Sequence, residues 1–153
     1  MSETTSGGPH GGFGGVNPTE AQMAAVMAGP DGPVQMINLL KFKDRADYPS
    51  DYDGPDDPDV SGEEAYGRYG ANTMPHVAKR GGRLVVLSAA NESVIGDPGE
   101  WDQVAIVEYP SRAAFIDMGQ DSDYLAGTVH RTAGLERTMI LATTPVIDAS
   151  NPG

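Results

Sequence analysis

His130 is the residue best suited to acid–base chemistry, because the ordinary pKa of histidine lies close to the pH of the cell. Its neighbours at helical spacing, Ala126, Ala133 and Gly134 among them, are small and leave room beside the ring. A histidine that only bonds across the end of a helix is the competing interpretation. We predict that His130 is catalytic and moves a proton.

Two further residues are predicted to act with His130. Asn38 stands among apolar residues, where an amide is disfavoured and needs hydrogen-bond partners. It would orient a ligand carbonyl or, alternatively, bond the backbone of a neighbouring loop. Tyr69 would donate a hydrogen bond to a bound oxyanion, although a tyrosine at this spacing is also typical of the edge of a core.

A second group of residues is predicted to bind the substrate: Met36, Lys41, Tyr66, Trp101 and Arg131. Lys41 and Arg131 would meet an anionic group, or else reach solvent or pair with the many acidic residues. Trp101 would form a pocket wall or only hold a hairpin together. Apolar residues among these favour a ligand that is small and apolar or contains a carbonyl group.

Several other chemistries lack the residues they need. The glycine-rich stretch 7–15 is not placed between a strand and a helix, as a phosphate-binding loop would be. The three histidines lack metal-ligand spacing, there is no cysteine, and no serine stands in a nucleophile elbow. We therefore expect neither a metal nor a cofactor.

Charge and composition argue against several classes of binding partner. The 153 residues carry 22 acidic against 10 basic side chains, a net charge of −12, which opposes contact with nucleic acid or anionic lipid. No apolar stretch is long enough to cross a membrane, and the start lacks the order of a secretory signal. We expect a cytoplasmic protein.

The hydrophobic pattern predicts a leading helix followed by the order β-α-β-β-α-β, an α+β fold of the ferredoxin-like type. Strands are expected at 34–42, at 83–90 with an extension through 93–95 as an alternative, at 102–109 and at 138–143, with a turn at 96–99. Helices are expected from Pro18 to about 29, from a Ser61 cap to about 80 with a kink or split at Pro75, and from Ser111 to about 133 with a break at 119–122. The domain spans 18–145, between tails at 1–17 and 146–153.

Both faces of the predicted sheet are apolar. Alternation places Met36, Val107, Met139 and Leu141 on one face and Ile37, Ile106 and Ile140 on the other. Helices cover only one face in this topology, and an apolar face of that size rarely stays in water. A homodimer that packs two sheets together is the predicted solution. The alternative is cover by the leading helix and the acidic loop 44–60.

Several short pieces of sequence resemble the DUF1330 family, a domain of unknown function. They include Asn38–Phe42, Ser61–Tyr69, Gly81–Arg83, Tyr109–Phe115 and His130–Ala133. The resemblance covers about residues 18–145 and implies the dimeric α/β-barrel superfamily, with a ferredoxin-like protomer and a homodimer. Relatives in that superfamily include cofactor-independent monooxygenases and isomerase-like enzymes. The family itself implies no reaction.

Two functions fit these observations. The first is a cofactor-free small-molecule enzyme in which His130 moves a proton while Asn38 and Tyr69 steady an enolate-like or oxygenated intermediate. Isomerisation, cyclisation and oxygen insertion all fit this scheme. The second is a non-catalytic carrier or sensor that holds a small ligand in the same cavity.

Overall fold

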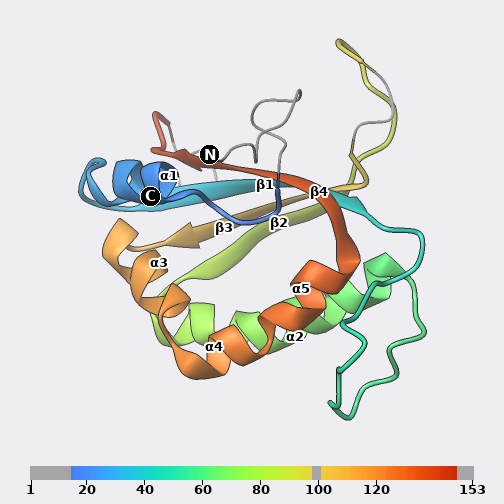
Figure 1. The fold of residues 1–153 in the computed structure, drawn as a ribbon. Helices are drawn as coiled ribbons and strands as arrows, with labels where there is room; N and C mark the ends of the chain where they lie inside the picture. The colour runs from blue at the N-terminus through green and yellow to red at the C-terminus, as the bar shows by residue number, and fades with distance from the viewer. Residues whose placement is uncertain (1–14, 98–100, 148–153) are drawn as a thin grey trace.

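The computed structural model describes residues 15–97 and 101–147. Its sheet has four antiparallel strands in the order β2-β3-β1-β4, with β1 at Val34–Phe42, β2 at Arg83–Ala89, β3 at Gln103–Tyr109 and β4 at Leu135–Thr143. Figure 1 shows this sheet as one layer above a layer of helices. The element order and the strand order are those of the ferredoxin-like fold, as predicted.

Within the described residues, five helices accompany the sheet: α1 at Glu20–Met27, α2 at Gly62–Lys79, α3 at Arg112–Gly119, α4 at Ser122–Ala126 and α5 at Thr128–Gly134. The Ser61 hydroxyl accepts from the backbone nitrogen of Glu64 at 3.0 Å and starts α2 where predicted. The predicted split at Pro75 is wrong, since α2 is continuous. Buried Thr73 and Val77 hold the turns on both sides of the proline.

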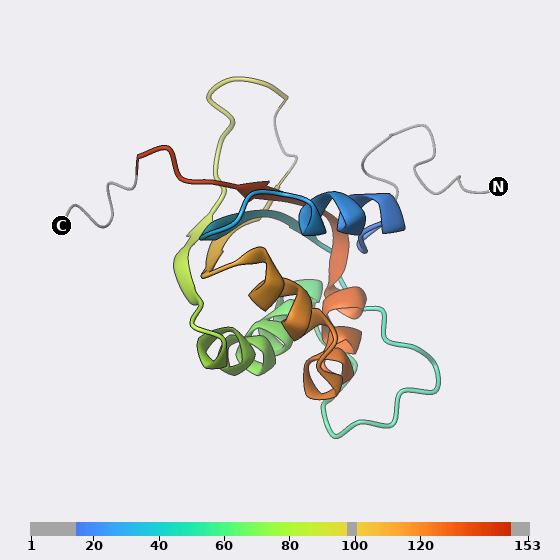
Figure 2. The ribbon, with the colours of Figure 1, turned by 90° about the vertical axis from the view of Figure 1, so that its left-hand side faces the viewer.

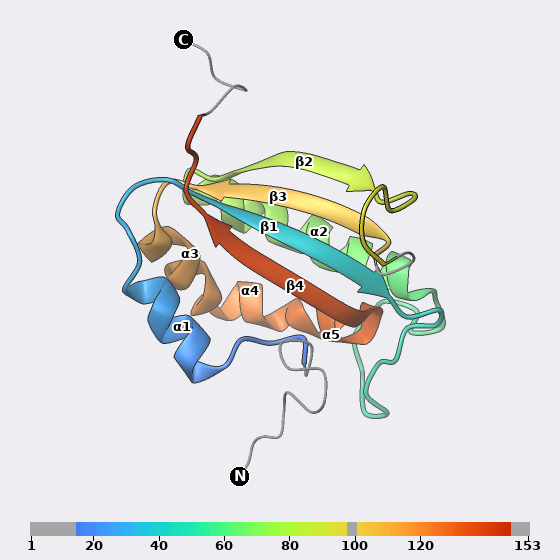
Figure 3. The same ribbon diagram turned by 90° about the horizontal axis from the view of Figure 1, so that it is seen from above.

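The leading helix does not cover the sheet. α1 begins one residue after Thr19, whose hydroxyl caps Gln22, so Pro18 precedes the cap and does not form the first turn. Figures 2 and 3 show α1 beside the β4 edge of the sheet. There it packs against α3, and Arg112 donates to the carbonyl of Val26 at 3.2 Å. The alternative in which this helix covers the second face is therefore wrong.

The inner face of the sheet packs on the helices and holds the core. Two of its buried clusters are Val34, Met36, Val77, Val107, Tyr109 and Met118, and Leu40, Phe42, Ala105 and Leu135. The strand pairing corrects one predicted assignment. Because Leu39 pairs with Met139 and Ile37 with Leu141, these β4 residues lie on the outer face, and Ile140 lies on the inner one.

The outer face is apolar and is open in Figure 3. Strand register places the following side chains on it: Ile37, Leu39, Val86, Val104, Ile106, Met139 and Leu141. Beyond the end of β2 at Ala89, Val94 and Ile95 are more than nine-tenths exposed. Strand β2 thus does not extend through them. The predicted turn at 96–99 lies partly outside the described residues.

The acidic loop 44–60 hangs on the helical side of the molecule in Figures 1 and 2, far from the outer face. Val16, within the predicted N-terminal tail, packs against the Leu40 cluster. Residues 1–14 and 148–153 of the predicted tails lie outside the described residues. Among the described helices, none has the length and apolarity that a membrane span requires.

Candidate active site

The packing of α2 against α5 fixes the position of His130. Gly134 ends α5 directly against Gly62, the first residue of α2: a Cβ atom on Gly134 would lie 2.4 Å from the carbonyl oxygen of Gly62. Only a glycine permits this approach without a shift of the backbone. The close contact holds His130, one turn earlier on α5, against the N-terminal half of α2.

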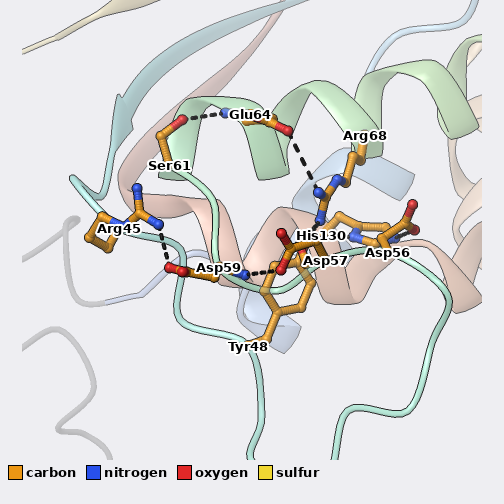
Figure 4. A network of polar contacts seen from close by, with 9 residues as sticks. All are labelled: Arg45, Tyr48, Asp56, Asp57, Asp59, Ser61, Glu64, Arg68 and His130. Carbon is orange, nitrogen blue, oxygen red and sulfur yellow. Dashed lines mark hydrogen bonds and ion pairs between the residues drawn. The ribbon is translucent and has the colours of Figure 1, made fainter.

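The acidic loop closes over His130 from the other side. Its base is fixed by backbone hydrogen bonds, from Asp47 to the carbonyl of Ala133 at 2.9 Å and from Ala46 to that of Val60 at 2.8 Å. Immediately after this base, Tyr48 turns inward to the imidazole, as Figure 4 shows. The loop is therefore part of the site, as its rim.

Each nitrogen of His130 faces one group of the loop. The side chain is buried, with Nδ1 at 2.7 Å from the hydroxyl of Tyr48 and Nε2 at 3.5 Å from a carboxylate oxygen of Asp56. The rings of Tyr48 and Tyr52 stand edge-on to it. Burial lowers the pKa of His130, nearby Arg68 lowers it further, and Asp56 opposes the shift. The imidazole is therefore neutral at neutral pH.

Arg68 completes the cluster from α2. Its Nη1 donates to the hydroxyl oxygen of Tyr48 at 3.0 Å and to the backbone carbonyl of Asp57 at 2.7 Å, while Nη2 lies 3.7 Å from the carboxylate of Glu64. A guanidinium has only donors and carries a positive charge, so the phenol oxygen accepts a charge-assisted hydrogen bond here. Arg68, Tyr48 and His130 thus form a line of three hydrogen-bonded groups in which a proton can move between Tyr48 and His130.

Two hollows adjoin the helical layer. One has a volume of about 390 Å³ and is lined by Ala46, Asp47, Tyr48, Pro49, Ser50, Tyr52, Pro58 and Asp59. Tyr48 therefore borders both this hollow and the buried histidine. The other, of about 400 Å³, lies between α1 and α3, where Arg112 packs over Gly29. Arg112 joins these two helices, so we assign it a structural role.

Comparison with known proteins identifies the family. The family described as "Domain of unknown function (DUF1330)" matches residues 57–145. This chain belongs to the DUF1330 family. The match confirms the predicted resemblance and includes Arg68 and His130. Tyr48 and Asp56 precede the matched region.

Solved structures of similar proteins have no stated function. RPA0582 from Rhodopseudomonas palustris, described as a protein of unknown function, is 33% identical over 88% of this chain and 98% of its own, with a TM-score of 0.77. The structure of its methylated form is 32% identical over 88% of this chain and 96% of its own, with a TM-score of 0.78. A dabb family protein with a ferredoxin-like fold from Mesorhizobium loti is 13% identical over 75% of this chain and 98% of its own, with a TM-score of 0.48. No curated protein matches this chain.

In this DUF1330 protein the predicted tyrosines lie between helices and sheet. The ring of Tyr66 packs between those of Phe42 and Tyr69, at 5.5 and 5.3 Å, and the hydroxyl of Tyr69 lies 2.9 Å from that of Tyr124. Burial raises the pKa of Tyr66 and of Tyr124, while Arg131 lowers both. Tyr66, Tyr69 and Tyr124 therefore share one region, and Arg131 of α5 lies near enough to act on it.

Asn38 bonds the sheet in which it lies. Its Nδ2 donates to the carbonyls of Met36 at 3.1 Å and Ala105 at 3.3 Å. Carbonyl oxygens only accept, so this orientation of the amide follows from its partners. Both amide hydrogens are used, and the oxygen of Asn38 is what a ligand could meet. Met36 itself is buried in the core.

Lys41 and Trp101 each contact a charged side chain. The ammonium of Lys41 lies 3.5 Å from Asp102, and the guanidinium of Arg137 lies 5.1 Å from the centre of the Trp101 ring. The predicted set is thus divided between several regions, and His130 meets a group from the loop. Across residues 15–97 and 101–147, no three histidine or acidic side chains form a group that could hold a metal ion.

The sequence reasoning missed Tyr48, Asp56 and Arg68. A usable signal was present, because Tyr48 and Tyr52 are aromatic residues within a loop otherwise rich in Asp and Pro. Aromatic side chains in so polar a segment indicate that the segment packs against something. Their partner could not be named, since His130 is far away in the chain.

Proposed function

We propose that this DUF1330 chain is a cofactor-independent enzyme that transfers a proton on a small molecule, with His130 as its acid–base group. One observation carries the proposal: a buried imidazole held at 2.7 Å by a phenol that a guanidinium also contacts. A neutral histidine with a hydroxyl partner both accepts and donates protons near pH 7. A histidine that only fills the core would not need a guanidinium, that of Arg68, on its phenol partner Tyr48.

The substrate class follows from the chemistry of His130 and the residues proposed to act with it. Proton transfer next to a carbonyl, the step shared by isomerisation and cyclisation, produces an enolate-like intermediate that a hydrogen-bond donor stabilises. Tyr69 stays in the proposal as a further phenol that would donate to the substrate. Asn38 stays in it with a changed task, because its amide hydrogens bond strand carbonyls and its oxygen would accept from the ligand. A cytoplasmic location, with no metal or cofactor, completes this proposal.

The test uses solvent exchange and needs no known substrate. A panel of small ketones and lactones with acidic C–H groups is incubated with the protein in D₂O, and loss of the C–H signal is followed by NMR. The proposal expects at least one compound to exchange about 100-fold or more faster with wild type than with H130Q, the usual range for an acid–base group. H76Q serves as the matched control.

Two outcomes oppose the proposal. If H130Q exchanges a compound as fast as wild type, His130 is not the acid–base group. If compounds bind at the site and none exchanges, the protein is a carrier or sensor. The control variant H76Q must retain the wild-type rate, because His76 lies near Asp121, on another part of α2.

We further propose that the protein is a homodimer in which the outer faces of two sheets pack together. The support is the open row of apolar side chains on that face, each of which gains roughly 1.5–3 kcal/mol when buried. A second copy presents the same apolar face, and the ion pairs Lys41–Asp102 and Arg83–Glu108 leave little net charge among the charged residues beside it. Such a self-complementary surface suits a twofold interface.

A further inference from the structure

The contact between Arg68 and Tyr48 determines the direction of a hydrogen bond. A guanidinium has only donors, so the oxygen of Tyr48 accepts from Nη1 of Arg68 at 3.0 Å. The single hydrogen of that hydroxyl is then free to donate elsewhere. Nδ1 of His130, at 2.7 Å, lies in position to accept it.

We propose that Arg68 is a positioning residue that acts through Tyr48 to hold His130 in the tautomer with its hydrogen on Nε2. Nδ1 accepts from Tyr48, so the one hydrogen of the neutral ring belongs on Nε2. Arg68 is itself fixed by the backbone carbonyl of Asp57 at 2.7 Å, and its side chain is only 18% exposed. The tautomer stands independently of catalysis, and its use in a reaction rests on the proposed function.

The tautomer decides what kind of group His130 can meet. Nε2–H points toward a carboxylate oxygen of Asp56 at 3.5 Å, which is long for a hydrogen bond between a ring N–H and a carboxylate. Asp56 belongs to the loop and is 45% exposed, so this side of the ring is the one nearest to solvent. A ligand atom in its place must be an acceptor. The site therefore selects a carbonyl or enolate oxygen over an ammonium group.

The same line of groups balances the proton transfer. When Nε2 gives its proton to an enolate oxygen, an N–H bond breaks and an O–H bond forms on the ligand. Nδ1 takes the hydroxyl proton of Tyr48, so the ring stays neutral and a phenolate forms. The positive charge of Arg68, with Nη1 at 3.0 Å from that oxygen, stabilises the phenolate. The bare Nε2 then takes a proton from a ligand C–H group or from solvent while Nδ1 returns its proton to Tyr48, and this restores the Nε2–H tautomer.

The test is ¹⁵N NMR of protein labelled in its histidine rings, at a pH where His130 is neutral. Nitrogen shifts distinguish a protonated ring nitrogen from a bare one, and the loss of a signal in H130Q assigns His130. Wild type is expected to show the Nε2–H tautomer alone. Replacing Arg68 with Met, which has no donor, should give a mixture of both tautomers, and R68K should restore the single form.

The matched control is E64Q, which changes the exposed partner of Arg68 and leaves the contact with Tyr48 in place. It should keep the wild-type tautomer. Hydrogen on Nδ1 in wild type, or an unchanged tautomer in R68M, would overturn the proposal. The wild-type spectrum decides even if R68M does not fold. A single Nε2–H tautomer without any exchange activity would refute the proposed function and leave this inference intact.

Discussion

Tyr48 and His130 are 82 residues apart in the chain, and the phenol oxygen of one lies 2.7 Å from Nδ1 of the other. Tyr48 follows the base of the loop and His130 lies on α5, so the contact links the loop to that helix. It joins the family-matched part of this DUF1330 protein to a segment that precedes the match. The loop therefore serves as a working part of the site.

Removal of the phenol oxygen should weaken both stability and catalysis. Y48F leaves Nδ1 of His130 and Nη1 of Arg68 without this partner, and a lost buried hydrogen bond costs roughly 1–3 kcal/mol. Urea unfolding measures that loss. The matched control is Y52F, which keeps the ring contacts of Tyr52 with Tyr48 and His130. Equal stability of Y48F and Y52F would show that the hydroxyl contributes nothing.

Stability should fall in acid because of His130. Its folded pKa lies below the ordinary value of 6.5, so the unfolded chain binds its proton first as the pH falls. The free energy of unfolding is therefore expected to be full above pH 6.5 and to decline as the pH drops through the lowered folded pKa. Urea titrations between pH 7.5 and 5 measure the slope. H130Q should remove this part of the slope, and an identical slope in H130Q would contradict the assignment.

A second decline in stability is expected at lower pH from Asp121. Its hydrogen bond from Arg80 at 3.0 Å lowers the pKa of this carboxyl to about 2, from an ordinary 3.8. The stabilisation is present above pH 3.8 and is lost as the pH falls toward 2. D121N should lack this acid decline, as measured by thermal unfolding between pH 5 and 2. If D121N and wild type lose stability in parallel, the ion pair is not its source.

The contact between α2 and α5 should tolerate no added carbon. G134A places a Cβ 2.4 Å from the carbonyl oxygen of Gly62 and 2.9 Å from the backbone nitrogen of Tyr66, so we expect a loss of about 1–3 kcal/mol. G67A is the control, because Gly67 is exposed within α2 and has open space around it. It should gain roughly 0.5–1 kcal/mol. Urea unfolding that shows losses of equal size would contradict the packing account.

A charge on the outer face should separate the dimer. Leu141 on β4 and Leu125 on α4 are 48% and 49% exposed, which makes them a matched pair on opposite sides of the protein. L141E should sediment as a monomer at micromolar concentration, because the carboxylate would be buried without a partner. L125E should keep the mass of wild type. A monomeric wild type, or a dimeric L141E, would exclude the proposed interface.

The order of elements could be predicted from sequence because local signals agree with the fold. Val34–Phe42 alternates buried and half-buried positions in the observed strand, and Ser61 caps the helix that its spacing predicts. The faces of β4 could not be predicted from sequence. Met139, Ile140 and Leu141 are consecutive and all apolar, so alternation does not show which of them point inward. Thr138 is buried on the inner side, where its hydroxyl donates to the carbonyl of Leu39. The polar side chain of Thr138 did not predict this buried position.

The site was predictable only in part, for a related reason. His130 could be identified from its own chemistry and small neighbours, whereas its partners come from a loop without periodicity. The contacts of such a loop depend on tertiary packing, which no local pattern encodes. Asn38 shows the opposite case: its position among apolar residues correctly indicated an amide that needs partners, and these proved to be strand carbonyls.

The most direct measurement of the central claim is the pH dependence of the proton-exchange rate for wild type and H130Q side by side. His130 with its lowered pKa should be neutral at pH 7. The wild-type rate should then hold near neutral pH and fall in acid as the ring takes up a proton, while H130Q stays at a low rate throughout. Profiles of the same height and shape in both proteins would contradict the account.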